Sequence, residues 1–410
     1  MMKDNLLKIP NTKYQIQPLK IAIDARFYGV TGIGRYLSNL ITYLEQIDQE
    51  NDYTIFLRKE NINEYQPKNP RFKKELADYQ WYTFAEQFGM LKHLYQGKFD
   101  LVHFPHLNVP LLYFKPYIVT IHDLIMGDAP DAATVQFKPY FYFKRFIYRF
   151  VAWWVSHVSK KVIVPTETVK KEVIAHAHVN PQKIIVTYEG VDNVFEKFKY
   201  QNSNTKNNEE AVLKKYKIRK PYLAYLSSFY PHKNHKLLID ALELLQLEGY
   251  LYNNESLQLV LIGKKDIFAE KISEYIKSKS LSDKIILPGM IEESGYTPDE
   301  EVAVILSRAL LYVSPSLKEG FGITFFEAMS MGLPILLSDV SCMPEVALDA
   351  AEYFDPYNVS ELKEKIKMVL GDEQKRNDLI HKGKERLKFF SWEKMARETL
   401  GVYIRVSKTM

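Results

Sequence analysis

Short apolar runs alternate with longer amphipathic stretches along the first half of this chain, and this alternation constrains the fold more than any other feature. The runs lie at 19–24, 53–57, 101–104, 118–122, 162–165 and 184–188. Their lengths are those of buried strands, and the stretches between them have helical periodicity. Strands that alternate with helices favour a parallel sheet covered on both faces. We therefore expect a doubly wound α/β domain.

A second copy of the same pattern follows a polar segment. Residues 201–210 read QNSNTKNNEE and suit a linker. Strand-like runs then recur at 222–226, 257–262, 284–287, 311–313 and 335–338, and the chain becomes helical from about Ser360. The expected organisation is a Rossmann-like domain at 1–200, a linker at 201–218, a second Rossmann-like domain at 219–390 and a C-terminal helix at 391–410.

Composition agrees with two ordinary globular domains. The chain has 410 residues, of which 46% are apolar and 26% charged. A net charge of +5 is too weak to predict nucleic-acid binding. The single cysteine, Cys342, excludes an internal disulfide and fits a reducing cytoplasm. The first twenty residues have no apolar signal-peptide core, and no apolar run reaches the length of a membrane span, so we expect a cytoplasmic protein.

The segment 315–334 carries the clearest functional signal. Glu319 and Glu327 flank a short turn, Gly320-Phe321-Gly322, which leads into an amphipathic stretch. With the apolar run before it, the segment predicts a strand, a loop and a helix whose first N–H groups suit a phosphate. Carboxylates accept hydrogen bonds from sugar and ribose hydroxyls. The segment therefore predicts a nucleotide-sugar site.

Each of these glutamates also has a purely structural explanation. Thr324 and Glu327 have the spacing of a capping box, in which the glutamate only satisfies N–H groups at a helix start. Glu319, taken alone, is equally well a solvated loop charge. Local spacing leaves these alternatives open.

A glycine-rich turn follows the first predicted strand. Gly32 and Gly34 resemble the start of a dinucleotide fingerprint, but Leu37 stands where its third glycine should be. The turn, which also includes Gly29, is expected before a helix from about Arg35 to Ile47. Its functional use would be a close approach of backbone to a phosphate or acceptor, and its structural alternative is a tight strand-to-helix turn.

Aromatic and basic residues are concentrated at 137–158. The segment reads FKPYFYFKRFIYRFVAWWVSHV, with apolar residues nearly all round the expected helix and only basic charges. Such a helix suits a membrane interface, where rings lie at headgroup depth and Lys and Arg face anionic lipid. The alternative is a helix packed between the sheet and another layer of its own domain.

Several motifs occur together in one order along the chain. They are Asp24-Ala25-Arg26, Thr31-Gly32-Ile33-Gly34-Arg35-Tyr36, Thr120-Ile121-His122-Asp123-Leu124, Pro231-His232-Lys233-Asn234, Glu319-x7-Glu327, Ser338-Asp339-Val340-Ser341-Cys342-Met343-Pro344-Glu345-Val346 and Phe390-Ser391-Trp392-Glu393. This ordered set resembles the retaining glycosyltransferases of family GT4. The resemblance covers about residues 19–395 and implies the GT-B fold, in which two Rossmann-like domains face each other across a cleft. It also implies that the last helix, about 392–406, crosses back to the first domain.

The resemblance implies a role for each matching residue. Glu319 would lie by the donor sugar, Glu327 on the nucleotide ribose, Lys233 on the diphosphate and His122 in the sugar site. Without the family context, Lys233 is a surface charge and His122 a structural histidine. The remaining residues implied to contact substrate or nucleotide are Gly32, Gly34, Gly320, Phe321, Gly322, Ile323, Thr324, Met290 and Ile291.

One departure from the family concerns the diphosphate. Many relatives have a Gly-Arg pair after the first strand of the second domain, whereas this chain has Leu226-Ser227-Ser228-Phe229-Tyr230. Either Lys233 and a helix N-terminus suffice, or Lys264 or Lys318 substitutes. The chain also contains no D-x-D, the usual carboxylate pair that binds a sugar nucleotide through a divalent cation, so we expect no metal and no cofactor.

The predicted activity is retaining transfer of a hexose from a nucleotide-diphosphate sugar to a glycan or lipid-linked acceptor. By resemblance, the donor is GDP-mannose, the process is O-antigen or other surface polysaccharide synthesis, and the enzyme is cytoplasmic and peripheral at the inner face of the membrane. UDP-hexose donors stay open. So do two other classes of protein, a sugar-nucleotide epimerase or hydrolase of the same fold and a catalytically idle partner.

Overall fold

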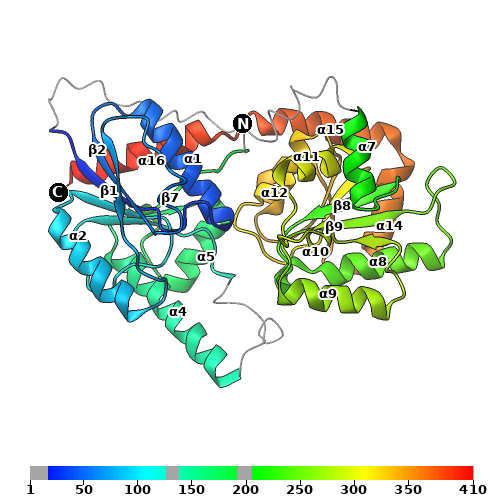
Figure 1. The fold of residues 1–410 in the computed structure, drawn as a ribbon, viewed down its shortest axis with the longest axis horizontal. Helices are drawn as coiled ribbons and strands as arrows, with labels where there is room; N and C mark the ends of the chain where they lie inside the picture. Colours follow the sequence, from blue (N-terminus) through cyan, green and yellow to red (C-terminus); the bar gives the residue numbers. More distant parts are fainter. Residues whose placement is uncertain (1–16, 126–137, 192–205, 410) are drawn as a thin grey trace. The chain divides into compact units, whose positions relative to one another are not determined.

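A computed structural model of the chain describes residues 17–125, 138–191 and 206–409. The chain divides into two compact units (Figure 1). The described residues of unit 1 are 17–125, 138–190 and 390–409, and those of unit 2 are 191 and 206–389.

Unit 1 is built on a parallel sheet. Its strands are β1 (Lys20–Asp24), β2 (Asp52–Leu57), β3 (Phe72–Leu76), β4 (Leu101–Phe104), β5 (Tyr117–Thr120), β6 (Lys161–Val164) and β7 (Ile184–Val186). They lie in the order β3-β2-β1-β4-β5-β6-β7, and every pair is parallel. The order reverses between β1 and β4. A sheet with that reversal is doubly wound, which confirms the fold class predicted for this half.

Helices cover the sheet of unit 1. They are α1 (Thr31–Ile47), η1 (Glu86–Met90), α2 (Leu91–Gly97), α4 (Lys138–Val158), α5 (Glu167–Ala177), η3 (Pro181–Lys183) and α16 (Trp392–Ser407). Helix α16 packs against α1, and α4 packs against α5 (Figure 1). Side chains of β4, β5 and β6 join Ala152 and Val155 of α4 and Val169 and Val173 of α5 in one buried cluster.

Unit 2 repeats this plan. Its strands are β8 (Tyr222–Leu226), β9 (Gln258–Ile262), β10 (Ile285–Ile286), β11 (Leu311–Ser314), β12 (Ile335–Ser338) and β13 (Glu352–Phe354). The parallel order is β10-β9-β8-β11-β12-β13, so the chain reverses direction across the sheet between β8 and β11. This is the order of a dinucleotide-binding Rossmann domain. The second predicted α/β domain is also confirmed.

The helices of unit 2 alternate with its strands. They are α7 (Lys206–Lys215), η5 (Pro231–Lys233), α8 (His235–Leu247), α9 (Ile267–Ser278), α10 (Pro288–Ile291), α11 (Asp299–Arg308), α12 (Ile323–Ser330), α13 (Met343–Ala347), η6 (Leu348–Ala350), α14 (Val359–Gly371) and α15 (Glu373–Leu387). Their inner faces are apolar. In α8, for example, Leu238, Ile239 and Leu242 are fully buried.

The structure differs from the sequence-based expectation at several elements. Strands β3 and β13 were not predicted, because each is short, partly exposed and at a sheet edge, where polar residues replace the apolar run. Helix α1 begins at Thr31 rather than near Arg35. Residues 206–215, within the expected linker, form helix α7, and the rest of the polar segment at 201–205 lies outside the described residues.

Among the described residues, no helix has the length and apolar character needed to cross a bilayer.

A buried hydrogen-bond network fixes α16 to the sheet of unit 1. His103 on β4 pairs through Nδ1 with the Tyr403 hydroxyl at 2.7 Å and through Nε2 with Thr120 Oγ1 at 2.8 Å. Tyr36 of α1 reaches the same threonine oxygen at 3.2 Å. Burial, with a smaller effect of nearby His122, lowers the pKa of His103 to about 3. The ring is therefore neutral, with one donor and one acceptor nitrogen.

Replacing Tyr403 by Phe tests this attachment. The change leaves a buried nitrogen of His103 without its partner, and an unsatisfied buried polar group costs about 1–3 kcal/mol, so we expect the free energy of unfolding of unit 1 to fall by that amount. All tryptophans belong to unit 1, namely Trp81, Trp153, Trp154 and Trp392. Denaturant unfolding followed by tryptophan fluorescence therefore reports on this unit.

The control for this measurement is Tyr357→Phe, at an exposed position of unit 2. A Tyr403→Phe curve that overlays the wild-type curve would show that the network does not hold α16 in place.

Candidate active site

The topology of unit 2 brings two predicted residues together. The loop after β8 contains Lys233, and the loop after β11 contains Glu319. Strands β8 and β11 are neighbours at the point where the strand order reverses. In open α/β sheets, ligands bind in the crevice outside the carboxyl ends of the strands at this point. The two residues therefore lie where a doubly wound domain normally binds its ligand.

Lys233 and Glu319 form an ion pair. The Lys233 ammonium lies 2.7 Å from Glu319 Oε1, and the side chains are 15% and 12% exposed. Ser316 donates its hydroxyl to the same carboxylate oxygen at 2.7 Å. The Tyr225 hydroxyl lies 2.7 Å from Ser316 Oγ and 3.2 Å from the Lys233 carbonyl oxygen, to which it donates. Ser341 fixes the backbone of Glu319 by accepting from its N–H and donating to its carbonyl.

These contacts keep Glu319 ionised. Burial by itself would raise the pKa of Glu319, but the charge and hydrogen bond of Lys233, the hydroxyl of Ser316 and the nearby His232 outweigh burial and lower it. At neutral pH, Glu319 is therefore an anion and cannot donate a proton. The explanation of Glu319 as a freely solvated loop charge does not fit this environment.

Helix α12 presents its N-terminus after the same loop. Gly322 is the N-cap and has a left-handed backbone, with φ +89°, and a Cβ built there would lie 2.0 Å from the Phe325 ring. The loop geometry therefore requires glycine. Helix α12 begins at Ile323, so Thr324 is already helical, and it accepts a hydrogen bond from Tyr312 at 3.0 Å.

The capping-box explanation for Glu327 is therefore wrong. A capping box needs Thr324 as the N-cap residue, whereas Gly322 has that position. Glu327 is fully buried in the second turn of α12, and Gly320 and Phe321 complete the loop before it. The structure thus brings Glu319, the loop 320–322 and α12 into one strand–loop–helix unit beside Lys233.

The residues predicted to contact the base lie at the same end of the sheet. Met290 and Ile291 are in the short helix α10, which follows edge strand β10, and Ile291 is half exposed. A Cβ on Gly289 would lie 2.1 Å from the Gly263 carbonyl oxygen, and one on Gly263 would lie 2.3 Å from the Ser227 carbonyl oxygen. Backbone therefore packs directly on backbone across the ends of β10, β9 and β8.

The segment in which many relatives have the Gly-Arg pair lies at the end of β8. Ser228 is exposed just after β8, and Phe229 beside it is buried and stacks on His235 at 4.7 Å. Burial, aided by the charge of Lys233, lowers the pKa of His235 to about 3, so His235 adds no positive charge. The suggested substitutes, Lys264 after β9 and Lys318 after β11, both follow strands that neighbour β8.

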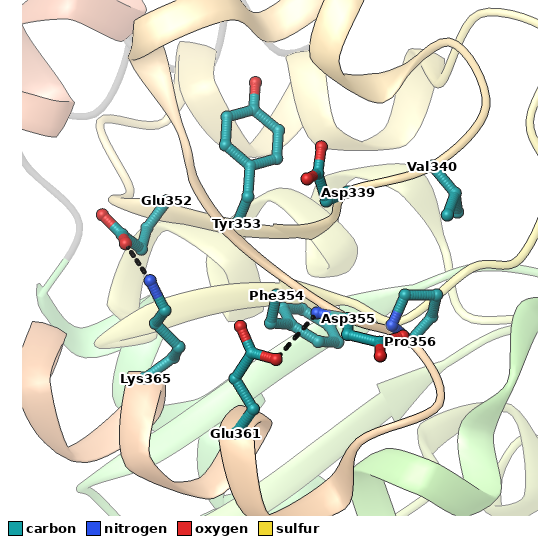
Figure 2. Close-up of a pocket in the computed structure, with 9 residues that line it drawn as sticks. All are labelled: Asp339, Val340, Glu352, Tyr353, Phe354, Asp355, Pro356, Glu361 and Lys365. Atoms are coloured by element: carbon teal, nitrogen blue, oxygen red, sulfur yellow. Dashed lines mark hydrogen bonds and ion pairs between the residues drawn. The ribbon is translucent and has the colours of Figure 1, made fainter.

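A cavity of about 470 Å³ lies at the ends of β12 and β13 (Figure 2). Its lining includes Asp339, Asp355 and Glu361, and Figure 2 shows the ion pair of Lys365 with Glu352. This excess of carboxylates does not suit a diphosphate. In the part of the chain that the structure describes, no three His, Cys, Asp or Glu side chains gather as a metal site would require.

In unit 1, the glycine motif lies within the first turn of α1. A Cβ on Gly34 would meet the Phe27 carbonyl oxygen at 2.8 Å and Gly29 backbone at 2.9 Å, so Gly34 permits close packing. Gly32 has no atom within 4 Å of such a Cβ. The turn predicted to hold both residues is thus helical, and packing requires glycine only at Gly34.

His122 lies in the loop after β5, between two acceptors. Its Nδ1 is 3.1 Å from Glu189 Oε1, and its Nε2 is 3.1 Å from the Pro105 carbonyl oxygen. Tyr36 packs edge-on against the imidazole, with the two ring centroids 4.7 Å apart. The imidazole is thus held at both ring nitrogens, with a carboxylate at one and a backbone carbonyl at the other.

Sequence reasoning missed Glu189, Ser316, Tyr225 and Ser341. Glu189 had a usable signal, because it directly follows the predicted strand 184–188 and so belongs to the same sheet edge as His122. The other three residues are identified only by their contacts. By contrast, Asp24 and Arg26 of the motif Asp24-Ala25-Arg26 form a buried ion cluster with Glu86, which is a structural role.

Two family models match this chain. Glycosyltransferase Family 4 matches residues 30–194, and Glycosyl transferases group 1 matches residues 206–386. The first match falls mainly in unit 1 and the second in unit 2.

Individual proteins are similar over parts of the chain. O-antigen chain mannosyltransferase B of Escherichia coli is 31% identical over 47% of this chain and 48% of its own length, so the match spans about half of that relative. O-antigen chain mannosyltransferase RfbU of Salmonella typhimurium is 23% identical over 70% of each chain. The crystal structure of Anabaena Alr3699/HepE with UDP and glucose superposes with a TM-score of 0.70 at 13% identity, covering 94% of this chain and 99% of that one.

The family matches follow the order of the two Rossmann-like units, and together they cover most of the chain. This chain therefore belongs to the family 4 glycosyltransferases and has their GT-B fold.

Proposed function

We propose that this chain transfers a hexose, with retention of anomeric configuration, from a nucleotide-diphosphate sugar to a glycan or lipid-linked acceptor. The first candidate donor is GDP-mannose and the process is surface polysaccharide synthesis, because the similar proteins include two O-antigen mannosyltransferases. One observation carries the proposal. It is the ion pair of Lys233 with Glu319 at the strand reversal of unit 2, beside the N-terminus of α12.

The donor's diphosphate would be bound by Lys233 and the first-turn N–H groups of α12. A lysine is a compact cation that neutralises charge as a leaving group departs. Glu327, buried in the same helix, would hold the ribose, and the backbone at Met290 and Ile291 would contact the base. Because these groups supply positive charge to the diphosphate, we propose that the reaction needs no metal ion.

Glu319 would act by its charge. In the proposed binding mode, the diphosphate takes a share of the Lys233 ammonium, and the carboxylate then faces the sugar. A negative charge there stabilises the positive charge that develops at the anomeric carbon. An ion-paired carboxylate with a lowered pKa is a weak base, so double displacement with Glu319 as nucleophile is the less favoured route.

The bond changes balance without an added reagent. The bond from the anomeric carbon to the diphosphate oxygen breaks, and the acceptor oxygen bonds to that carbon on the same face. The departing phosphate oxygen takes the proton of the acceptor hydroxyl. Unit 1 would bind the acceptor, with Gly32 and Gly34 at the start of α1 contributing to its site. His122, held by Glu189, would line the sugar site.

A UDP-sugar donor is the second candidate. It is favoured by the HepE structure, which contains UDP and glucose on a similar fold.

A calorimetric melting panel with GDP, UDP, ADP and their sugar derivatives tests the donor class. A ligand at one hundred times its Kd stabilises the native state by about 2.7 kcal/mol. We expect GDP and GDP-mannose to raise the melting temperature, with the same shift in EDTA. A shift with uridine nucleotides alone would move the proposal to a UDP-sugar donor. No shift with any nucleotide would contradict the proposed site.

We expect substitution of one glutamate to lower turnover and substitution of the other to weaken nucleotide binding. Glu319→Gln removes the charge beside the reacting carbon, so we expect turnover to fall at least about a hundredfold, in the range seen when one transition-state contact is lost. Its donor Kd should not rise, because Lys233 remains and no longer shares its charge with a carboxylate. Glu327→Gln should instead weaken nucleotide binding by about tenfold or more, since a lost hydrogen bond to a charged group costs about 1.5–3 kcal/mol.

Initial rates and calorimetric titration with the donor measure both effects, and exposed Glu385→Gln is the matched control. Wild-type turnover in Glu319→Gln would refute its assigned role.

A further inference from the structure

Helix α4 has two apolar faces instead of one. Its inner residues Phe141, Ala152 and Val155 are buried. Its outer residues, which we call the α4 aromatic face, are 41–68% exposed. They are Phe143, Phe146, Ile147, Phe150 and Trp153. Their spacing of three or four residues places them on one side of the helix. The alternative of a helix packed between two layers of its own domain is therefore wrong.

A neighbouring loop enlarges this surface. Leu112 and Phe114 are 56% and 61% exposed. Trp154 of α4 joins the loop to the helix, because its indole N–H donates to the Leu111 carbonyl at 3.1 Å and its ring meets Phe114 at 6.4 Å. In Figure 1, the first turns of α4 extend beyond the sheet of unit 1. The exposed apolar surface thus spans two elements, and patches of this kind mark interaction sites.

The acidic and basic side chains of α4 itself have one sign. Helix α4 contains no Asp or Glu. Exposed Arg149 lies one turn from both Phe146 and Trp153, and exposed Lys144 lies one turn from Ile147. At the end of the helix, Lys183 donates to the His157 carbonyl. Burial, together with the charges of Lys160 and Lys161, lowers the pKa of Lys183 to about 8.

We infer that the α4 aromatic face and the loop 112–114 dock on a lipid bilayer that contains anionic phospholipid. Aromatic rings suit the headgroup boundary, and Lys and Arg beside them pair with lipid phosphates. A second copy of this chain suits the face less well, because an isologous contact would place Arg149 and Lys144 against the same basic residues. The inference deepens the proposed function, since a lipid-linked acceptor is presented at a bilayer.

Vesicle cosedimentation with the full chain tests the docking directly. We expect the wild type to bind vesicles of phosphatidylglycerol and phosphatidylcholine at least tenfold more tightly than vesicles of phosphatidylcholine alone, and to release in high salt. Phe146→Ser with Phe150→Ser should weaken binding to the anionic vesicles at least tenfold. Arg149→Glu should remove most of the preference for phosphatidylglycerol.

The matched control is Leu247→Ser with Tyr357→Ser, which removes two exposed apolar side chains from unit 2 and should leave vesicle binding unchanged. The rise in melting temperature on adding nucleotide is measured in every variant. It confirms that each variant is folded, and it distinguishes failure of the docking from failure of the proposed donor site. Equal vesicle binding by wild type and Phe146→Ser/Phe150→Ser would overturn the inference. So would light scattering that shows a dimer dissociated by the same substitutions, because the face would then belong to a second copy.

Discussion

The ion pair between Lys233 and Glu319 links two loops that are 86 residues apart in the chain. It exists because β8 and β11 are adjacent only in a sheet whose strand order reverses between them. Both side chains are mostly buried, and removing one member of a buried pair leaves a charge that costs about 3–5 kcal/mol. This costly ion pair lies at the carboxyl ends of the strands of unit 2, beside the N-terminus of α12. A pair positioned in this way serves ligand chemistry better than it serves stability, because apolar residues of similar volume would stabilise the fold at least as well.

In the proposed binding mode, the same arrangement couples donor binding to the state of Glu319. A diphosphate and the carboxylate would compete for one ammonium group, so a bound donor would weaken the hold of Lys233 on Glu319. Ser316, supported by Tyr225, still donates to the carboxylate and keeps it in place. The anion is therefore preorganised before the sugar arrives, which is the condition for effective electrostatic catalysis.

The histidines of this chain show how neighbours decide the role of one residue type. Burial lowers the pKa of His103, His106 and His235 to about 3 or 4, and these rings are neutral structural groups. His122 differs from them because a buried carboxylate, Glu189, faces one nitrogen and a carbonyl faces the other. Sequence alone could not separate the four, since His103 and His122 both stand at or just after a strand. Only the contacting groups distinguish His122, which faces a carboxylate, from the three neutral histidines.

Central strands and the loop containing Glu319 were predictable because a buried parallel strand must be apolar and the loop after it must be short and glycine-containing. Edge strands β3 and β13 were not, because an exposed edge tolerates polar residues such as Lys73 and Glu352. The start of α1 was misplaced because glycines normally indicate a turn, yet Gly34 is needed inside a helix that packs on the backbone of Gly29. The hydroxyl of Ser316 left no sequence signal, since its role depends on a tyrosine that is 91 residues away.

Helix α4 could be recognised from sequence as unusual but not as exposed. Aromatic residues all round a helix are compatible with two arrangements. The helix is either buried on two sides, or buried on one side with a bilayer on the other, and hydropathy does not distinguish the two. Exposure separates them, because Phe146 is 68% accessible while Val155 on the inner face is fully buried. The side chains of the α4 aromatic face stay 41–68% exposed in the native state, so folding leaves much of their apolar area in water. Their apolar area, with basic residues at its margin, is therefore explained by what the folded protein contacts and not by what holds it together.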